Sequence, residues 1–137
     1  MSIIIKVVYT KRMNYESQNT PRVFFEKSTF NQNLELNFSI NQLDKENYEI
    51  IMQSVVRTSN EKDETVSQIF VEKAGVFEVK DIPEEDLQEV LNVNLPSILF
   101  PYLRQEVENI VHYSGLPPFH IQPISFYDIY QNKKSKG

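Results

Sequence analysis

Apolar and polar residues alternate along the first half of the chain, as they do in strands that bury one face. This pattern predicts four strands, at residues 3–9, 33–40, 48–59 and 65–79. Gly75 interrupts the last of these and is predicted to mark a bulge or bend. A polar turn at residues 60–64 joins the last two segments. Strands joined by such turns indicate an antiparallel, meandering sheet.

Residues 10–33 are predicted as a long connection, because the alternation fades there and Pro21 interrupts it. Connections of this length are uncommon in compact domains unless they have a function. The segment also holds Phe24, Phe25 and Phe30, so aromatic side chains are not confined to the strands.

The hydrophobic period becomes helical after Ile82. An acidic helix start at residues 83–86 suits the helix dipole, and residues 95–113 form the main helix. Pro101 is expected near the start of that helix, where few carbonyls lie upstream to lose a donor. A short helix follows Ser125, which is a candidate N-cap.

Strands followed by helices predict an α+β fold with the helices on one side of a four-stranded antiparallel sheet. The length of 137 residues fits one domain. Within it, residues 1–82 are mainly strands, residues 83–130 mainly helical, and residues 131–137 a flexible tail.

Composition excludes several classes of function. The chain has no Cys, two His, three Gly and a net charge of −5. Thiolate zinc sites, phosphate-binding Gly loops and clustered basic patches for nucleic acid are therefore not expected. No secretory signal or membrane-spanning segment is visible, which predicts a cytoplasmic protein. We expect no enzyme activity, no metal and no cofactor.

The C-terminal half resembles the signature of the SecB family of protein-export chaperones. The segment is "SILFPYLRQEVENIVHYSGLPPFHIQPISF". The matching residues are Ile98, Leu99, Phe100, Pro101, Tyr102, Arg104, Gly115, Pro118, Pro123, Ile124 and Phe126. The segment "VVYTKRMNYESQNTPRVFFEK" is similar to the N-terminal part of the family, so the resemblance runs from about Ile3 to Tyr130.

The resemblance implies an ATP-independent chaperone that holds unfolded polypeptides for protein transport. It also implies a homotetramer, a dimer of dimers in which protomers pair through their sheets and dimers stack through the long helix. Leu103 and Val107 are assigned by this analogy to the interface between dimers. A helix that is apolar on nearly every side fits such double contact.

The resemblance further implies that unfolded segments lie in apolar grooves. Leu34, Leu36 and Phe38 are expected to form the groove wall, and Phe30, Phe126, Ile129 and Tyr130 its rim or cover. Ordinary core packing is the alternative for each of them, because alternation does not tell which sheet face is covered.

Family members that deliver clients to the export motor ATPase, SecA, carry an acidic sheet face. The matching positions here are Arg12, Glu16, Gln68 and Phe70, of which only Glu16 keeps the acid. This predicts weak or absent docking to SecA. It leaves open a chaperone dedicated to one partner, such as the antitoxin of a toxin–antitoxin pair, or a structural oligomer without a client.

Overall fold

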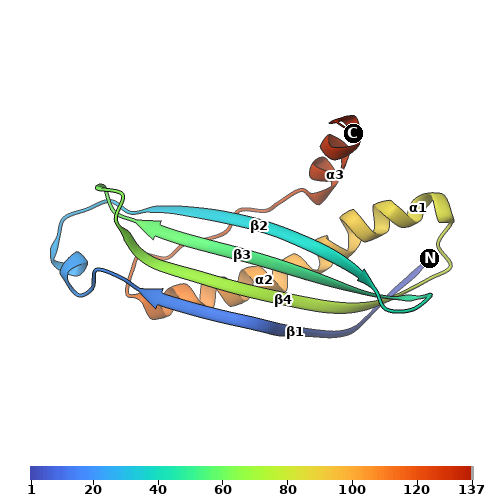
Figure 1. Ribbon diagram of the computed structural model, residues 1–137, viewed down its shortest axis with the longest axis horizontal. Coiled ribbons are helices and arrows are strands. Elements are labelled where there is room, and N and C mark those ends of the chain that lie inside the picture. Colours follow the sequence, from blue (N-terminus) through green and yellow to red (C-terminus); the bar gives the residue numbers. More distant parts are fainter. Residues whose placement is uncertain (137) are drawn as a thin grey trace.

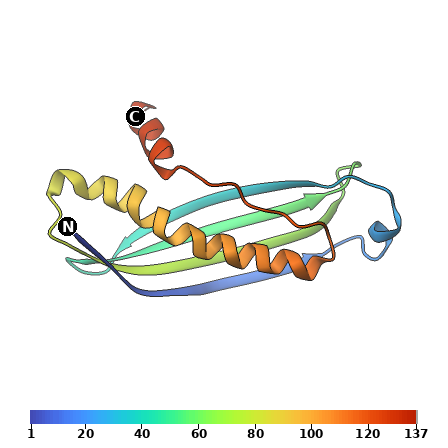
Figure 2. The same ribbon diagram turned by 180° about the vertical axis from the view of Figure 1, so that it is seen from behind.

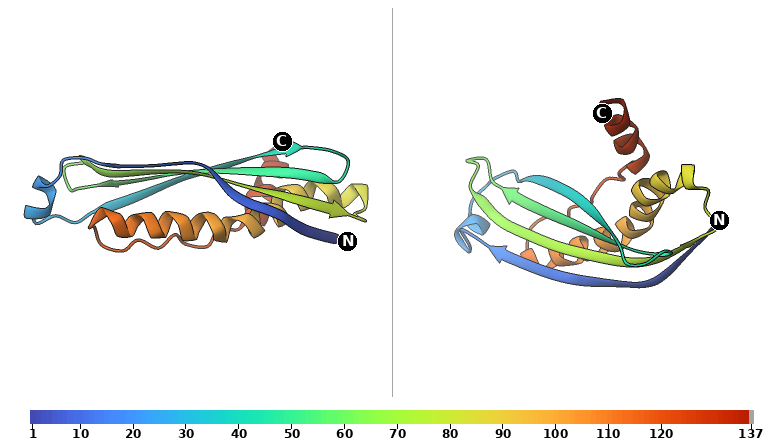
Figure 3. Two further views of the ribbon diagram at one scale, coloured as in Figure 1. Left: turned by 90° about the horizontal axis from the view of Figure 1, so that it is seen from below. Right: turned by 45° about the vertical axis from the view of Figure 1, so that its right-hand side comes forward.

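The computed structural model describes residues 1–136, which form an antiparallel sheet with a helical layer on one face (Figures 1, 2 and 3). The four strands are β1 (Ser2–Ser17), β2 (Asn31–Gln42), β3 (Asn47–Ser59) and β4 (Thr65–Lys80). Their order across the sheet is β1-β4-β3-β2. The predicted α+β class and the four-stranded sheet are confirmed, and no helix within residues 1–136 is long and apolar enough to cross a membrane.

β1 and β2 lie at opposite edges of the sheet, so the segment between them crosses the whole end of it (Figure 1). The prediction that the first strand stops at Tyr9 is wrong, because β1 continues to Ser17. The alternation fades in β1 because it is an edge strand that is largely exposed on both faces. Two register shifts, between Ile5 and Val7 and between Thr10 and Arg12, disrupt the period further.

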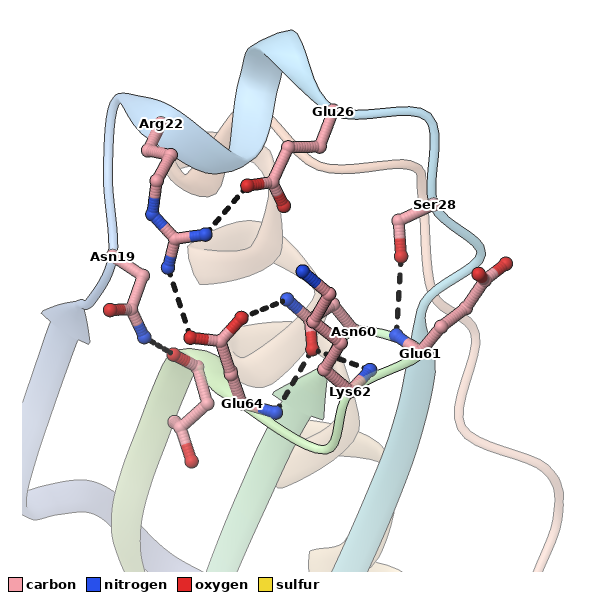
Figure 4. A network of polar contacts seen from close by, with 9 residues as sticks. Asn19, Arg22, Glu26, Ser28, Asn60, Glu61, Lys62 and Glu64 are labelled. Carbon is pink, nitrogen blue, oxygen red and sulfur yellow. Dashed lines mark hydrogen bonds and ion pairs between the residues drawn. The ribbon is translucent and has the colours of Figure 1, made fainter.

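Polar side chains fasten the crossing segment to the β3–β4 turn (Figure 4). Arg22 pairs with Glu26 at 2.6 Å and with Glu64 at 3.0 Å. The Asn60 side chain accepts hydrogen bonds from the Glu64 and Lys62 amides and donates one to the Glu64 carboxylate. These contacts fix the end of the sheet at which the chain passes from β1 to β2.

The helical layer is one continuous run from Glu84 to Ser114. Its parts are α1 (Glu84–Glu89), the π-helical turn η2 (Val90–Asn94), α2 (Leu95–Val111) and the 3-10 turn η3 (His112–Ser114). Pro101 therefore lies in the middle of the run. The expectation that it lies near the start of the helix is wrong, because the helical run begins at Glu84. Pro101 and Ser97 are both exposed, so the Ser97 carbonyl that loses its donor can bind water.

The π turn accommodates the other proline, Pro96. The Leu95 amide bonds the Val90 carbonyl five residues back, which widens the helix just before the proline ring. The Ser97 hydroxyl donates to the Val93 carbonyl at 2.5 Å. The helix therefore stays hydrogen-bonded on either side of Pro96.

α2 packs its apolar face on β3 and β4. Leu95, Leu99, Leu103 and Val107 are all fully buried there. The assignment of Leu103 and Val107 to an interface between dimers is wrong, because both side chains face the sheet of their own protomer. The outward face carries Ile98, Pro101, Tyr102 and Gln105 instead.

Gly75 allows this close packing. A Cβ at this position would lie 2.9 Å from the Phe77 ring and 3.3 Å from the Leu99 side chain. The register shifts lie elsewhere, in β1 and at the start of β4, so the predicted bulge at Gly75 is not found. Close approach of the helix explains the glycine better than a bend.

The chain ends in α3 (Phe126–Lys136), which projects past the β2 edge (Figures 1 and 2). Ser125 caps it as predicted, since its hydroxyl accepts a hydrogen bond from the Asp128 amide at 3.2 Å. The helix continues through Lys136, although a flexible tail is expected from residue 131. Residue 137 of that expected tail lies outside the described residues.

Candidate polypeptide-binding groove

The free edge of the sheet carries a row of apolar side chains. Alternation along β2 turns Leu34, Leu36, Phe38 and Ile40 toward the helical layer. All are half-buried and pack against the core, with Leu36 opposite Ser54 and Phe38 opposite Met52 on β3. Because β2 has no neighbour on its outer side within residues 1–136, this row is only partly covered.

α3 reaches this row through one anchor, Phe126. Its side chain is only 3% exposed, and its ring meets Phe38 and Phe100 edge to face with centroids 5.8 Å apart in both pairs. Such aromatic pairs stabilise beyond their buried area. Phe126 therefore covers Phe38 and joins β2 to the long helix.

A groove opens between β2 and α3. Its lining residues are Leu36, Asn37, Phe38, Phe126, Ile129 and Lys133, around a cavity of about 220 Å³. Pockets for drug-sized ligands are larger, on the order of 300–1,000 Å³. The groove is therefore suited to one apolar side chain at a time rather than to a cofactor.

The structure brings together four of the seven residues predicted for polypeptide binding. Leu36, Phe38, Phe126 and Ile129 line the groove, and Ile129 is 39% exposed at its rim. Phe30, Leu34 and Tyr130 are half-buried but do not line it. The alternative of ordinary core packing holds in part, because Leu34, Leu36 and Phe38 all pack against the core as well.

Sequence reasoning missed Asn37 and Lys133 among the lining residues. Lys133 lies seven residues after Phe126, which is two helical turns and hence the same face. Its ammonium lies 6.0 Å from the Phe38 ring centroid. Helical spacing identifies Lys133 as a lining residue only if the predicted C-terminal helix continues beyond residue 130, as α3 does.

The four positions predicted for partner docking do lie together, on the sheet face away from the helices. Register pairs Glu16 with Gln68 and places Phe70 two residues further along β4. The Arg12 guanidinium lies 5.0 Å from the Phe70 ring centroid. A shallow hollow of about 210 Å³ is lined by Asn14, Glu16, Val55, Gln68 and Phe70.

This outer face keeps more carboxylates than the predicted positions alone indicate. Glu72 pairs in register with Arg12, and Glu49 lies further along β3 on the same face. A hydrogen bond from the Tyr9 hydroxyl holds the pKa of Glu49 below its usual value and raises the pKa of Tyr9. Lys11 lies 3.6 Å from Glu49 as well. The Glu49 carboxylate of β3 is therefore partly neutralised by side chains of β1, across the intervening strand β4.

Comparisons with known proteins agree with this architecture. The chain is 34% identical over 135 residues to a protein named protein-export protein SecB from Nitrosomonas eutropha, covering 98% of this chain and 84% of the relative. It is 33% identical over 132 residues to the protein of the same name from Nitrosospira multiformis, covering 96% and 82%.

A solved structure shares the fold. It is a SecB-like chaperone of Mycobacterium tuberculosis in complex with a peptide from an antitoxin, with a TM-score of 0.73 and 19% identity over 90% of this chain and 91% of that one. The family model described as preprotein translocase subunit SecB matches residues 1–137. On the whole-chain match and the identity to its relatives, this chain belongs to the SecB family.

Proposed function

We propose that this chain is an ATP-independent chaperone that holds unfolded polypeptides, with protein export as its role. SecB proteins are chaperones and not enzymes, and the relatives of this chain in the family are named for protein export. The observation that carries the proposal is the groove between β2 and α3, where Leu36, Phe38 and Ile129 offer apolar surface beside a free sheet edge. Burial of client side chains there would supply the binding free energy.

Suppression of aggregation of a chemically denatured protein tests this proposal. We expect suppression without nucleotide and in the presence of a chelator. Ile129→Asp should weaken it, because a carboxylate at the groove rim opposes burial of apolar side chains. Tyr127→Asp is the matched control, since Tyr127 is 51% exposed on the same helix and does not line the groove. Equal suppression by both variants would place the client elsewhere.

The tetramer is part of the same proposal. The outward face of α2 surrounds a hollow of about 380 Å³ with Ile98, Pro101, Tyr102 and Gln105, and Tyr102 is 43% exposed. We assign the contact between dimers to this face in place of Leu103 and Val107. Ile98→Asp should reduce the mass measured by light scattering while far-UV circular dichroism stays unchanged. An unaltered mass would exclude this face.

Export is favoured over a chaperone dedicated to one antitoxin. The likeness to the antitoxin-bound chaperone is at 19% identity and supports a common fold alone. The relatives that match most of the chain at above 30% identity are named for export. Copurification from the native cell distinguishes the two roles, since a dedicated chaperone would carry one dominant partner.

A further inference from the structure

The groove is cationic although the chain as a whole is acidic. The net charge is −5, yet the only ionisable residue that lines the groove within residues 1–136 is Lys133. No carboxylate of residues 1–136 lies within 4.0 Å of the Lys133 or Lys134 ammonium. The nearest acid along the helix, Asp128, falls on the opposite face of α3.

Lys133 is held at the groove by the aromatic wall. Its ammonium lies 6.0 Å from the Phe38 ring centroid, at the outer limit for a cation–π contact. This weak contact positions the ammonium at the groove and leaves it able to pair with a ligand carboxylate. Lys134 lies 5.2 Å from the Tyr130 ring centroid and is a second positive charge on α3, although it does not line the groove. Lys133 itself is exposed, and its three N–H donors are accessible to a ligand.

Glu35, the acid next to the β2 wall, does not offset this charge. It is opposite Val55 in the register, which places it on the outer face of the sheet, away from the helices. A carboxylate brought to the groove by a ligand therefore meets Lys133 and no competing acid among the lining residues.

We propose that Lys133 makes the groove select extended client segments in which an apolar side chain is followed two residues later by Asp or Glu. This rests on the proposed function, because it names the client class of the same groove. In an extended chain, side chains two residues apart lie on one side at about 6.6 Å. That span is comparable to the 6.0 Å between Phe38 and the Lys133 ammonium. An apolar side chain that enters the groove beside Phe38 thus places its acidic neighbour within reach of Lys133, which lines the same groove.

Three short peptides test the proposal. Each carries one Leu in a Ser/Thr-rich background and differs only two positions later, where it has Asp, Asn or Lys. Fluorescence anisotropy at about 0.15 M ionic strength, where charges beyond about 8 Å are screened, reports the contact in the groove. We expect the Asp peptide to bind about two- to five-fold more tightly than the Asn peptide, as exposed ion pairs allow, and the Lys peptide to bind most weakly.

The variants separate Lys133 from the general charge of the chain. Lys133→Glu should reverse the order of the three peptides, and Lys133→Gln should bring them within about a factor of two, as expected when an exposed ion pair is lost. Lys45→Glu makes the same change of net charge in the exposed β2–β3 turn and should preserve the wild-type order.

The outcomes also separate this inference from the proposed function. Equal binding of all three peptides to the wild-type chain, or an unchanged order in Lys133→Glu, would overturn charge selection while aggregation assays still show holding. If none of the peptides binds and the denatured protein aggregates freely, the proposed function itself fails, and the client class with it.

Discussion

Replacing Phe126 with Ala should detach α3 without unfolding the domain. Removal of a buried Phe side chain costs about 3–5 kcal/mol, which includes the two edge-to-face contacts with Phe38 and Phe100. α3 also packs against η2, and its other described contacts are individually weaker. The Ser125 cap contributes about 1 kcal/mol and the Lys133 contact with Phe38 about 0.5–1 kcal/mol. Isolated helices of this length are marginal in water, so we expect α3 to undock once the Phe126 side chain is removed.

Hydrogen exchange resolved by peptide fragments measures this detachment. Loss of about 3 kcal/mol of docking free energy corresponds to a rise in exchange of at least about a hundred-fold for α3, whereas β3 and β4 should keep their protection. Tyr127→Ala on the same helix, at a side chain that is 51% exposed, should leave α3 protected. Unchanged protection of α3 in Phe126→Ala would show that Phe126 is not the anchor. Equal loss in β3 and β4 would show that α3 unfolds only with the whole domain.

Four further outcomes are expected. Gly75→Ala should lower the free energy of unfolding by about 1–3 kcal/mol in urea titrations, since its Cβ would overlap the Phe77 ring. Ser54→Ala should raise it by about 1 kcal/mol, because the buried Ser54 hydroxyl has no hydrogen-bond partner among residues 1–136. Hydrogen bonds from Asn60 and then Arg22 hold the pKa of Glu64 below its usual value. The ionised Glu64 carboxylate therefore contributes fully to stability above about pH 4.5, and this contribution is lost as the pH falls through the lowered pKa. Glu64→Gln should reduce this loss of stability in acid titrations followed by circular dichroism. Arg12→Asp combined with Phe70→Glu should strengthen calorimetric binding to a SecA tail at low salt, and the gain should fade at high salt; no gain would mean that docking uses another surface.

The sequence predicted those elements whose side chains alternate between a covered and an open face. β2 is the clearest case, because every second residue from Leu34 to Ile40 packs against the core. β1 was placed only to Tyr9, because an edge strand with polar residues on both faces has no period to detect. The pairing of β1 with β4 follows from tertiary structure and not from local pattern.

The candidate site was predicted in part for a similar reason. The resemblance to the SecB family assigned Phe126 and Ile129 to the groove, and the structure brings both to it. Spacing did not tell which side of the all-round apolar α2 faces the sheet, so Leu103 was assigned outward although it is fully buried. That choice depends on where β4 lets the helix approach, at Gly75, which only the folded chain determines.

The first strand, β1, pairs with the last strand, β4, and this affects the order in which the chain folds during synthesis. Ser17 pairs with Ser67 and Ser2 with Lys80, so β1 is translated first yet has no partner until β4 has been made. The two hairpins from β2 to β4 close over short turns and can form early, whereas β1 must wait for a pairing of high contact order. Until then its Ile3, Ile4 and Ile5 are an unpaired apolar segment on the ribosome. A nascent chain of this chaperone therefore presents, for a time, the kind of extended apolar segment that the finished protein is proposed to hold.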